Sequence, residues 1–290
     1  MKGIILAGGK GTRLYPLTLV TSKMLLPVYD KPMIYYPLSV LMQAGIKDVL
    51  IITTEQDLPR MEQLLGDGSA FGIKLTYMIQ YVPRGISDAF LIGEDFIGED
   101  ACTLILGDNI FYGKDLQTHL LDSAKKAEED GQASIYGYLV KDPERFGIVE
   151  LDKNGKAISI EEKPVHPKSN YCVTGLYFYP KGVAKHAKEL KPSLRGELEI
   201  TDLNNIYLNN NNLYVKTLNQ DYYWMDAGTH DSLVEASNTI KELESQLGYK
   251  ICCPEEIGYL NGWISKEELL KRAEEMKSNQ YGKYLMSIVK

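Results

Sequence analysis

Residues 6–14 read LAGGKGTRL and begin inside an apolar run at 3–8 that is typical of a buried strand. Beyond that run they bring glycines, cations and a threonine together. Glycines placed directly after a strand let backbone N–H groups approach a ligand closely, and they accept positive φ. A concave backbone of this kind attracts anions. Arg13 and Lys23 add cations, and an arginine can bind a phosphate through two hydrogen bonds. We therefore expect an anion-binding loop at the carboxyl end of the first strand, where open α/β sheets bind ligands.

Two familiar phosphate loops do not fit this stretch. A P-loop requires Gly-Lys followed by Ser or Thr, but here Gly9-Lys10 is followed by Gly11. The dinucleotide fingerprint requires a third glycine where Leu14 stands, and an acidic residue about 20 positions further on, a region that holds Lys31. A dinucleotide-dependent dehydrogenase is therefore disfavoured. A tight turn with surface cations remains the alternative for the loop taken alone.

Apolar runs and amphipathic segments alternate along the first half of the chain. Strands are expected at 3–8, 48–54, 74–80, 102–109 and 133–140, and helices at 33–45, 58–68, 86–97 and 115–131. Strands that alternate with helices in this way predict an α/β fold, with a mostly parallel sheet and helices on both faces.

The regular alternation of strands and helices ends after about residue 140. Residues 147–164 predict a β-hairpin, because two alternating strands flank the turn sequence Lys-Asn-Gly-Lys at 153–156. Further strands are expected at 170–180 and 213–219, a helix at 197–210, and helices from about 229 onward. The simplest organisation is an α/β core over residues 1–240, with an inserted part at about 140–220, and a helical extension over 241–290.

Composition excludes several classes of protein. The chain has 290 residues, of which 44% are hydrophobic and 24% are charged. Its net charge of −7 gives no indication of a basic face that would bind nucleic acid. No apolar run approaches the roughly 20 residues that span a bilayer, so no membrane partner is expected. Met1 leads straight into the first strand without a leader pattern, so we expect a cytoplasmic protein. The cysteines show no metal-binding spacing and are expected to be reduced thiols: Cys102, Cys172, Cys252 and Cys253.

Motifs along essentially the whole chain resemble the sugar nucleotidyltransferases, enzymes that join a sugar 1-phosphate to a nucleoside triphosphate and release pyrophosphate. The segments that carry the resemblance are LAGGKGTRL, SKMLLPVYDKPMI (22–34), LGDNIFYG (106–113), DPERFGIVE (142–150), EEKPVHPKSNYCVTGLYFY (161–179), LKPSLRGELEITDLN (190–204) and WMDAGTHDSLVEASN (224–238). The set looks like the branch of glucose-1-phosphate thymidylyltransferases. The resemblance implies a Rossmann-like sheet with a sugar-binding hairpin insertion. It also implies transfer of thymidylate from dTTP to glucose 1-phosphate, the first step toward dTDP-deoxysugars such as dTDP-rhamnose.

The reaction of this family is an in-line displacement at the α-phosphorus by an oxygen that is already anionic. It needs positioning and charge neutralisation rather than a protein nucleophile, and the four histidines indeed show no triad pattern. The resemblance implies that Asp108 and Asp226, each following a strand, hold Mg²⁺, an ion that prefers oxygen ligands. The implied catalytic set is Arg13, Lys23, Asp108, Lys163 and Asp226.

The resemblance also divides the substrate contacts between the two substrates. For the nucleotide it implies Gly8, Gly9, Gly11, Thr12, Arg13, Lys23, Gln80 and Gly85. For the sugar phosphate it implies Asn109, Gly147, Glu162, Lys163, Val173 and Arg195. Gln80 carries an amide, which offers both a donor and an acceptor to a pyrimidine edge. Glu161 and Glu162 are neighbours on a strand and point to opposite faces, so only one of them can face the sugar.

Three departures from the family pattern bear on specificity. Met24 stands where a glutamine would contact the nucleotide, Phe146 replaces a commoner tyrosine, and Ala227 loses a hydroxyl. Because a thioether is a weak acceptor, Met24 keeps UTP, or another pair of nucleotide and sugar phosphate, open as an alternative. A non-catalytic regulatory protein of the same fold is a second alternative.

The tail CPEEIGYLNGWI (253–264) looks like that of the longer, tetrameric members of the branch. The resemblance therefore implies a homotetramer, with feedback inhibition by a deoxysugar nucleotide such as dTDP-rhamnose at a subunit interface. The matching segments are 110–113 with His119 nearby, and 253–258.

Overall fold

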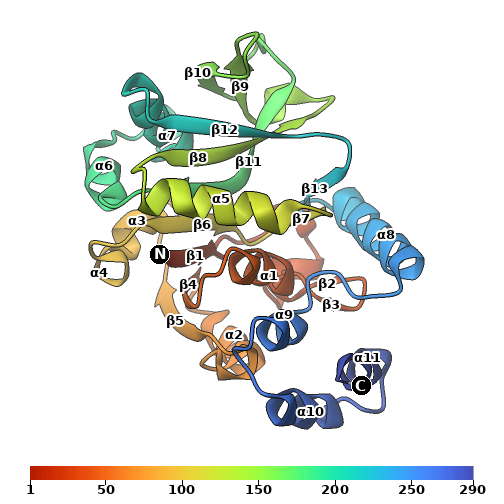
Figure 1. Ribbon diagram of the computed structural model, residues 1–290. Coiled ribbons are helices and arrows are strands. Elements are labelled where there is room, and N and C mark those ends of the chain that lie inside the picture. The colour runs from red at the N-terminus through yellow and green to blue at the C-terminus, as the bar shows by residue number, and fades with distance from the viewer. Residues whose placement is uncertain (290) are drawn as a thin grey trace.

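Strand β1 (Lys2–Leu6) lies inside the sheet and separates two hydrophobic layers. Ile4 and Ile5 are both fully buried but belong to different core clusters. Side chains alternate between faces along a strand, so each isoleucine packs under a different layer of helices. The computed structural model describes residues 1–289 and shows the sheet with helices on both sides (Figure 1).

The main sheet has nine strands, in the order β10-β9-β11-β6-β1-β4-β5, and β12 reaches it through β8, which pairs with β11. The pairs β1–β4, β1–β6, β4–β5 and β8–β12 are parallel. The strand bounds are β4 (Asp48–Thr53), β5 (Lys74–Ile79), β6 (Cys102–Leu106), β8 (Ala133–Leu139), β9 (Gly147–Leu151), β10 (Ala157–Glu162), β11 (Tyr171–Tyr179) and β12 (Leu213–Leu218).

Helices cover both faces of this sheet, as expected. The cluster with Ile5 takes residues from α1 (Tyr35–Gln43), α2 (Leu58–Leu65) and α5 (Leu116–Glu128). The cluster with Ile4 takes residues from α3 (Asp88–Ile92), α4 (Glu94–Ile97), α6 (Val183–Glu189) and α7 (Ile200–Asn209). The predicted α/β class, with helices on both faces of a large sheet, is confirmed.

Several local expectations are corrected. Strand β11 runs antiparallel between β6 and β8, so the parallel order is interrupted there. The expected helix at 86–97 is instead two short helices, because the helix is interrupted at Gly93. The expected strand at 102–109 ends at Leu106. The chain then turns and begins a new strand, β7 (Asn109–Gly113), which pairs with β13 (Tyr222–Asp226) in a separate two-stranded sheet. Helix α6 was not expected.

The hairpin is confirmed: β9 and β10 pair antiparallel across the turn that contains Gly155. A second short hairpin is formed by β2 (Pro27–Val28) and β3 (Lys31–Pro32). Five 3₁₀ turns complete the loops: η1 (Thr12–Leu14), η2 (Leu17–Leu19), η3 (Lys23–Leu25), η4 (Ser69–Phe71) and η5 (Pro143–Arg145). Three of these lie between β1 and β2, where the glycine-rich loop was found.

The C-terminal region is helical, as expected, and comprises α8 (His230–Leu247), α9 (Pro254–Leu260), α10 (Lys266–Glu275) and α11 (Gln280–Ile288). Helices α9 to α11 gather at the lower edge of the molecule in Figure 1, and they have a small core of their own that includes Leu269 and Leu285. A boundary after residue 240 stays a prediction, and α8 runs through that position without a break. No helix within residues 1–289 is long and apolar enough to cross a membrane.

Candidate active site

The glycine-rich loop leaves the carboxyl end of β1 and passes close to the end of β5. Gly9 and Gly11 adopt φ angles of 92° and 60°, which glycine accepts without strain. A Cβ added to Gly8 would lie 2.7 Å from Oε1 of Gln80, so a glycine allows this close approach. The hydroxyl of Thr18 donates to the carbonyl oxygen of Gly11 at 2.7 Å and holds the turn. The loop borders a cavity of about 480 Å³ that Gly9 and Gln80 line.

Gly85 joins the segment around residues 84–88 to the loop that carries Arg195. Its φ is 101°, and an added Cβ would lie 2.5 Å from the carbonyl oxygen of Leu198. The two segments are tied by backbone hydrogen bonds, from Leu198 N to Arg84 O at 2.6 Å and from Ser87 N to Leu198 O at 3.2 Å. The expected nucleotide-binding and sugar-phosphate-binding segments are therefore mechanically connected.

The carboxylates of Asp108 and Asp226 are brought to one place by the pairing of β7 with β13. The register sets Asp226 opposite Asn109. The backbone N–H of Ala227 donates to the carbonyl oxygen of Asp108 at 3.0 Å, which continues the pairing past the strand ends. Lys23, at the start of η3, forms an ion pair with Asp108.

The two carboxylates have opposite electrostatic surroundings. Burial, together with the negative charge of Asp108, raises the pKa of Asp226 to about 6. Three cations oppose this rise without cancelling it: Arg13, Lys23 and Arg145. Burial also disfavours the ionised form of Asp108, but the ammonium of Lys23, together with hydrogen bonds from Asn109 and the backbone, leaves the pKa of Asp108 below the ordinary carboxyl value.

The residues present fit a divalent cation. Oδ1 of Asp226 is buried and has no hydrogen-bond partner among residues 1–289. An orphaned carboxylate oxygen beside a second carboxylate suits Mg²⁺, which takes oxygen ligands and keeps several water molecules. The described part of the chain has no metal-binding group of three or more His, Cys, Asp or Glu side chains. Phosphate oxygens and water would therefore complete the shell around Asp108 and Asp226.

Arg13 reaches the same cluster from the glycine-rich loop. A Cβ added to Gly228 would lie 2.7 Å from a guanidinium nitrogen of Arg13 and 2.9 Å from Oδ1 of Asp226. Gly228 therefore leaves the space in which the guanidinium approaches the carboxylate. Thr12 precedes Arg13 in η1 and is exposed. The structure thus brings four members of the expected catalytic set together: Arg13, Lys23, Asp108 and Asp226.

Asp226 also lines a smaller cavity, of about 140 Å³. Its lining includes five of the six residues expected to bind the sugar phosphate, namely Asn109, Gly147, Glu162, Lys163 and Val173. Glu162 turns toward Thr201, whose hydroxyl donates to Oε2 at 2.6 Å. Glu161 instead pairs with Lys168, so the two neighbouring glutamates have different partners, and contact of Glu162 with a sugar stays a prediction.

The sixth residue, Arg195, is held by carboxylates. Its guanidinium donates to Oε1 of Glu162 at 3.1 Å and contacts Oε2 of Glu197 at 3.5 Å. Glu199, which is buried, accepts two hydrogen bonds from it, at 3.1 Å from Nε and at 2.8 Å from a terminal nitrogen. Hydrogen bonding to Glu199 raises the pKa of Arg195, despite partial burial. A bound phosphate would have to compete with these partners.

Lys163 adopts a φ of 42°, a left-handed conformation that costs energy for a residue with a side chain. Its backbone N–H donates to the carbonyl oxygen of Phe146 at 3.0 Å, so the conformation is held by the hairpin end. The ammonium is 3.9 Å from Glu162 and about half of the side chain is exposed. Backbone strain of this kind clusters at functional sites.

The side chain of Asn109 makes three hydrogen bonds within the protein. Its Oδ1 accepts from the backbone N–H of Gly175 at 3.0 Å and from Nε1 of Trp224 at 2.7 Å. Its amide donates to Oδ1 of Asp108 at 3.2 Å. In this structure Asn109 therefore orients Asp108 and Trp224, and direct contact with a sugar stays a prediction.

Sequence reasoning missed further residues at the site. Trp224, Thr201 and Arg145 line the smaller cavity. Trp224 could have been found, because it stands two positions before Asp226 on a strand and so shares its face. Thr201 lies in α7, and nothing local in the sequence connects that helix with the hairpin.

The three residues that depart from the family pattern, Met24, Phe146 and Ala227, all pack against other parts of the protein. Met24 is 1% exposed, and its sulfur lies 2.5 Å from where a Cβ on Gly107 would stand. Met24 therefore packs beneath the turn before Asp108 and does not line the larger cavity. The ring of Phe146 packs edge-on against Trp224, with centroids 5.5 Å apart. Ala227 is fully buried.

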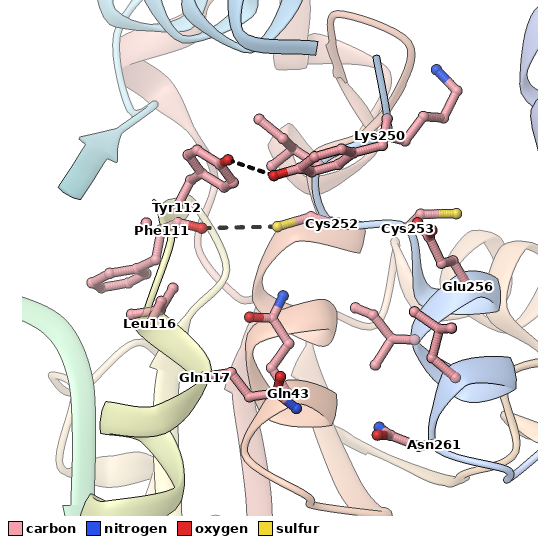
Figure 2. Close-up of a pocket in the computed structure, with 15 residues that line it drawn as sticks. Gln43, Phe111, Tyr112, Leu116, Gln117, Lys250, Cys252, Cys253, Glu256 and Asn261 are labelled. Carbon is pink, nitrogen blue, oxygen red and sulfur yellow. Dashed lines mark hydrogen bonds between the residues drawn. The ribbon is translucent and has the colours of Figure 1, made fainter. Parts of the chain in front are cut away.

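A further cavity, of about 460 Å³, lies between the core and the C-terminal helices (Figure 2). The segments 110–113 and 253–258 both contribute to it. Figure 2 shows Sγ of Cys252 beside the carbonyl oxygen of Phe111, 3.8 Å away, and the hydroxyl of Tyr112 is 3.0 Å from that of Tyr249. His119 does not line the cavity, and its Nε2 pairs with the hydroxyl of Tyr222 at 2.9 Å.

The sequence model described as nucleotidyl transferase matches residues 2–242. The chain belongs to the nucleotidyl transferase family. Full-length relatives of this nucleotidyltransferase are glucose-1-phosphate thymidylyltransferases. One from Neisseria meningitidis is 54% identical over 290 residues, 100% of both chains, and one from Xanthomonas campestris is 52% identical over 100% of this chain and 97% of its own.

A solved structure of the same kind supports the assignment. It is described as a putative glucose-1-phosphate thymidylyltransferase from Bacillus anthracis in complex with a sucrose. It is 46% identical with a TM-score of 0.76, and the match covers 82% of this chain and 94% of that one. A UDP-glucose pyrophosphorylase, 24% identical with a TM-score of 0.72, shares the fold alone. The predicted family and enzyme class are confirmed.

Proposed function

We propose that this nucleotidyltransferase transfers the thymidylyl group of dTTP to glucose 1-phosphate, giving dTDP-glucose and pyrophosphate. The observation that carries the proposal is the position of the Arg13–Lys23–Asp108–Asp226 cluster. Arg13 belongs to the loop that borders the larger cavity, and Asp226 lines the smaller one. A nucleotide in the first and a sugar phosphate in the second would meet at this cluster. Relatives that are about half identical over their full length carry this activity in their names.

The residues act by positioning and neutralising charge. Arg13 and Lys23 steady the triphosphate and the departing pyrophosphate. Lys163 and Arg195 hold the sugar phosphate, so that one of its oxygens faces the α-phosphorus in line with the leaving group. Gly8, Gly9, Gly11, Thr12 and Gly85 supply backbone around the nucleotide. Val173, Gly147 and Glu162 border the glucose.

Mg²⁺ is the proposed cofactor, and Asp108 and Asp226 would hold it. When bound, the ion would offset the charge of the phosphates and of the two carboxylates. Lys23 and Asp108 neutralise each other in the structure described here. When a triphosphate and Mg²⁺ bind, Lys23 would therefore contact the triphosphate and Asp108 would contact the ion. The expected location in the cytoplasm stays a prediction.

The test is pyrophosphate release with glucose 1-phosphate and Mg²⁺, comparing dTTP, UTP, ATP, CTP and GTP. We expect a clear preference for dTTP. Equal or better use of UTP would keep the mechanism and move the protein to another specificity, since one methyl group is worth only about 1–3 kcal/mol in an apolar pocket. Release with none of the nucleotides would contradict the proposal and favour a non-catalytic binding protein.

We also propose that the 460 Å³ cavity is a regulatory site in a homotetramer and takes a deoxysugar nucleotide such as dTDP-rhamnose. Support comes from the meeting of segments 110–113 and 253–258 there, and from exposed apolar side chains at its rim, Tyr249 and Leu260. Deleting the chain after about residue 250 should weaken assembly, inhibition or both. Unchanged oligomer mass by light scattering, with unchanged inhibition by dTDP-rhamnose, would overturn this second proposal.

A further inference from the structure

The amide nitrogen of Gln80 already donates a hydrogen bond within the protein. Gln80 follows β5, is 7% exposed and lines the larger cavity. Its Nε2 donates to Oδ2 of Asp88 at 3.2 Å. Asp88 is 1% exposed and begins α3. The hydrogen bond therefore lies in the buried wall of the cavity, where water cannot readily replace it.

Arg84 completes the arrangement from the surface side. Its Nε and a terminal nitrogen donate to Oδ1 of Asp88 at 3.1 Å and 2.7 Å. An ionised carboxylate has only acceptors to offer. If the Gln80 amide were reversed, its carbonyl oxygen would face Oδ2 of Asp88, and two acceptors would meet in a buried place. The pairing with Asp88 thus determines the orientation of the amide.

The other half of the amide faces the nucleotide loop. Oε1 of Gln80 lies 2.7 Å from the position that a Cβ on Gly8 would take. No hydrogen bond within residues 1–289 uses this oxygen. A free acceptor is therefore presented beside the loop that would hold the nucleotide, and none of the described residues supplies the matching donor.

We propose that Asp88, braced by Arg84, is a positioning residue that holds the Gln80 carbonyl toward the base and so selects a base with an imino N–H. The inference rests on the proposed function, because it assigns the larger cavity to the nucleotide. Thymine and uracil present N3–H, a donor, at their pairing edge. Cytosine presents N3 as an acceptor there. Gln80 can bond the first kind of edge and is repelled by the second, so the site discriminates by hydrogen-bond polarity and not by size.

The sharpest probe is 5-methyl-dCTP, which has the methyl group of thymine but reversed polarity at N3 and C4. The wild-type protein should use dTTP at least 100-fold better than 5-methyl-dCTP, measured as kcat/KM for pyrophosphate release with glucose 1-phosphate. A site that reads only shape would use the two nucleotides about equally. Equal use by the wild type would overturn the inference without any variant.

The variant that tests Asp88 is Asp88→Asn. Asparagine can offer either an acceptor or a donor to Gln80, so the amide is free to reverse. We expect the ratio of dTTP to 5-methyl-dCTP to fall by about tenfold, roughly the worth of one hydrogen bond, with the loss mainly in KM and not in kcat. Asp95→Asn makes the same chemical change on the exposed side of α4 and is the control, for which the ratio should stay at the wild-type value.

Failure of the inference and failure of the proposed function are distinguishable. A folded Asp88→Asn protein that keeps the wild-type ratio overturns the inference and leaves the proposed function intact. A wild-type protein without any turnover overturns the proposed function, and equilibrium binding of dTTP and 5-methyl-dCTP then decides the inference. If Asp88→Asn does not fold, Arg84→Met, which removes the exposed partner of Asp88, is measured in its place, and a wild-type ratio in that variant overturns the inference.

Discussion

Lys23 and Asp108 form an ion pair in which their side chains are only 16% and 9% exposed, although 85 residues separate them in the sequence. Asp226 lies beside this pair and makes no ion pair of its own within residues 1–289. Asp108 is therefore in direct contact with a cation, whereas the cations around Asp226 act on it only from a longer distance. This asymmetry predicts opposite effects of removing the two charges.

Asp226→Asn should stabilise the metal-free protein at pH 7.5 while abolishing turnover. The folded-state pKa of Asp226 is raised from 3.8 to about 6, so its negative charge opposes folding above that pH. The gain in free energy of unfolding should be on the order of 1–3 kcal/mol. Between pH 6 and 4 the folded state binds the extra proton, so the advantage of the variant should disappear as the pH falls through this window. Thermal unfolding in a chelator at pH 7.5 and pH 4.5 measures this.

Asp108→Asn is the matched control and should destabilise the metal-free protein at pH 7.5. It leaves the largely buried ammonium of Lys23 without its partner, and breaking such a pair costs about 3 kcal/mol or more when it is fully buried. If both substitutions shift the melting temperature in the same direction, the asymmetry between the two carboxylates is wrong.

Lys163→Ala should lower kcat/KM for glucose 1-phosphate by about 100-fold or more, because a cation facing the sugar phosphate is lost. Lys163→Gly should lose as much activity but be about 1 kcal/mol more stable than the alanine variant, since glycine accepts the φ of 42° without strain. Steady-state kinetics and urea unfolding of the pair separate the two effects. Wild-type turnover in either variant would refute the role of the ammonium.

Gly85→Ala should destabilise the protein by about 2 kcal/mol or more and raise KM for both substrates. The new Cβ would meet the backbone of Leu198 at 2.5 Å, so the two tied segments must separate. Gly155→Ala is the control: its φ of 80° is also positive, but nothing lies within 4 Å of the added atom. It should cost only the backbone strain, about 1 kcal/mol, with unchanged kinetics. Similar kinetics for the two variants would contradict the coupling of the segments.

The four thiols should not react with Ellman's reagent at pH 8 in the native protein and should all react in denaturant. All four are buried. Burial raises the pKa of Cys172 and of Cys252 to about 12, and raises the pKa values of Cys102 and Cys253 as well. The thiolate, which is the reactive form, is therefore scarce. Fast labelling of Cys253 alone would indicate instead that the C-terminal helices open locally.

Much of the fold could be predicted because its signals are local. The strand at 2–6 and the helix at 35–43 follow from apolar periodicity, and the hairpin turn follows from Asn-Gly. The break at Gly93 and the separate strand at 109–113 could not be predicted in this way. Both depend on what the chain packs against next, and for residues 109–113 that partner is a strand more than a hundred positions away.

The sequence by itself determined the chemistry available to this protein: a glycine-rich loop after the first strand, cations without a nucleophile, and carboxylates at strand ends. These are properties of residue type and neighbouring positions. Only the tertiary structure decided which of them act together. It set Asp226 beside Asp108, packed Met24 under Gly107, and turned the free oxygen of Gln80 toward Gly8. The reason is physical: hydrogen-bond orientation, ion pairing and burial are set by contacts between segments far apart in the chain, and no local pattern encodes them.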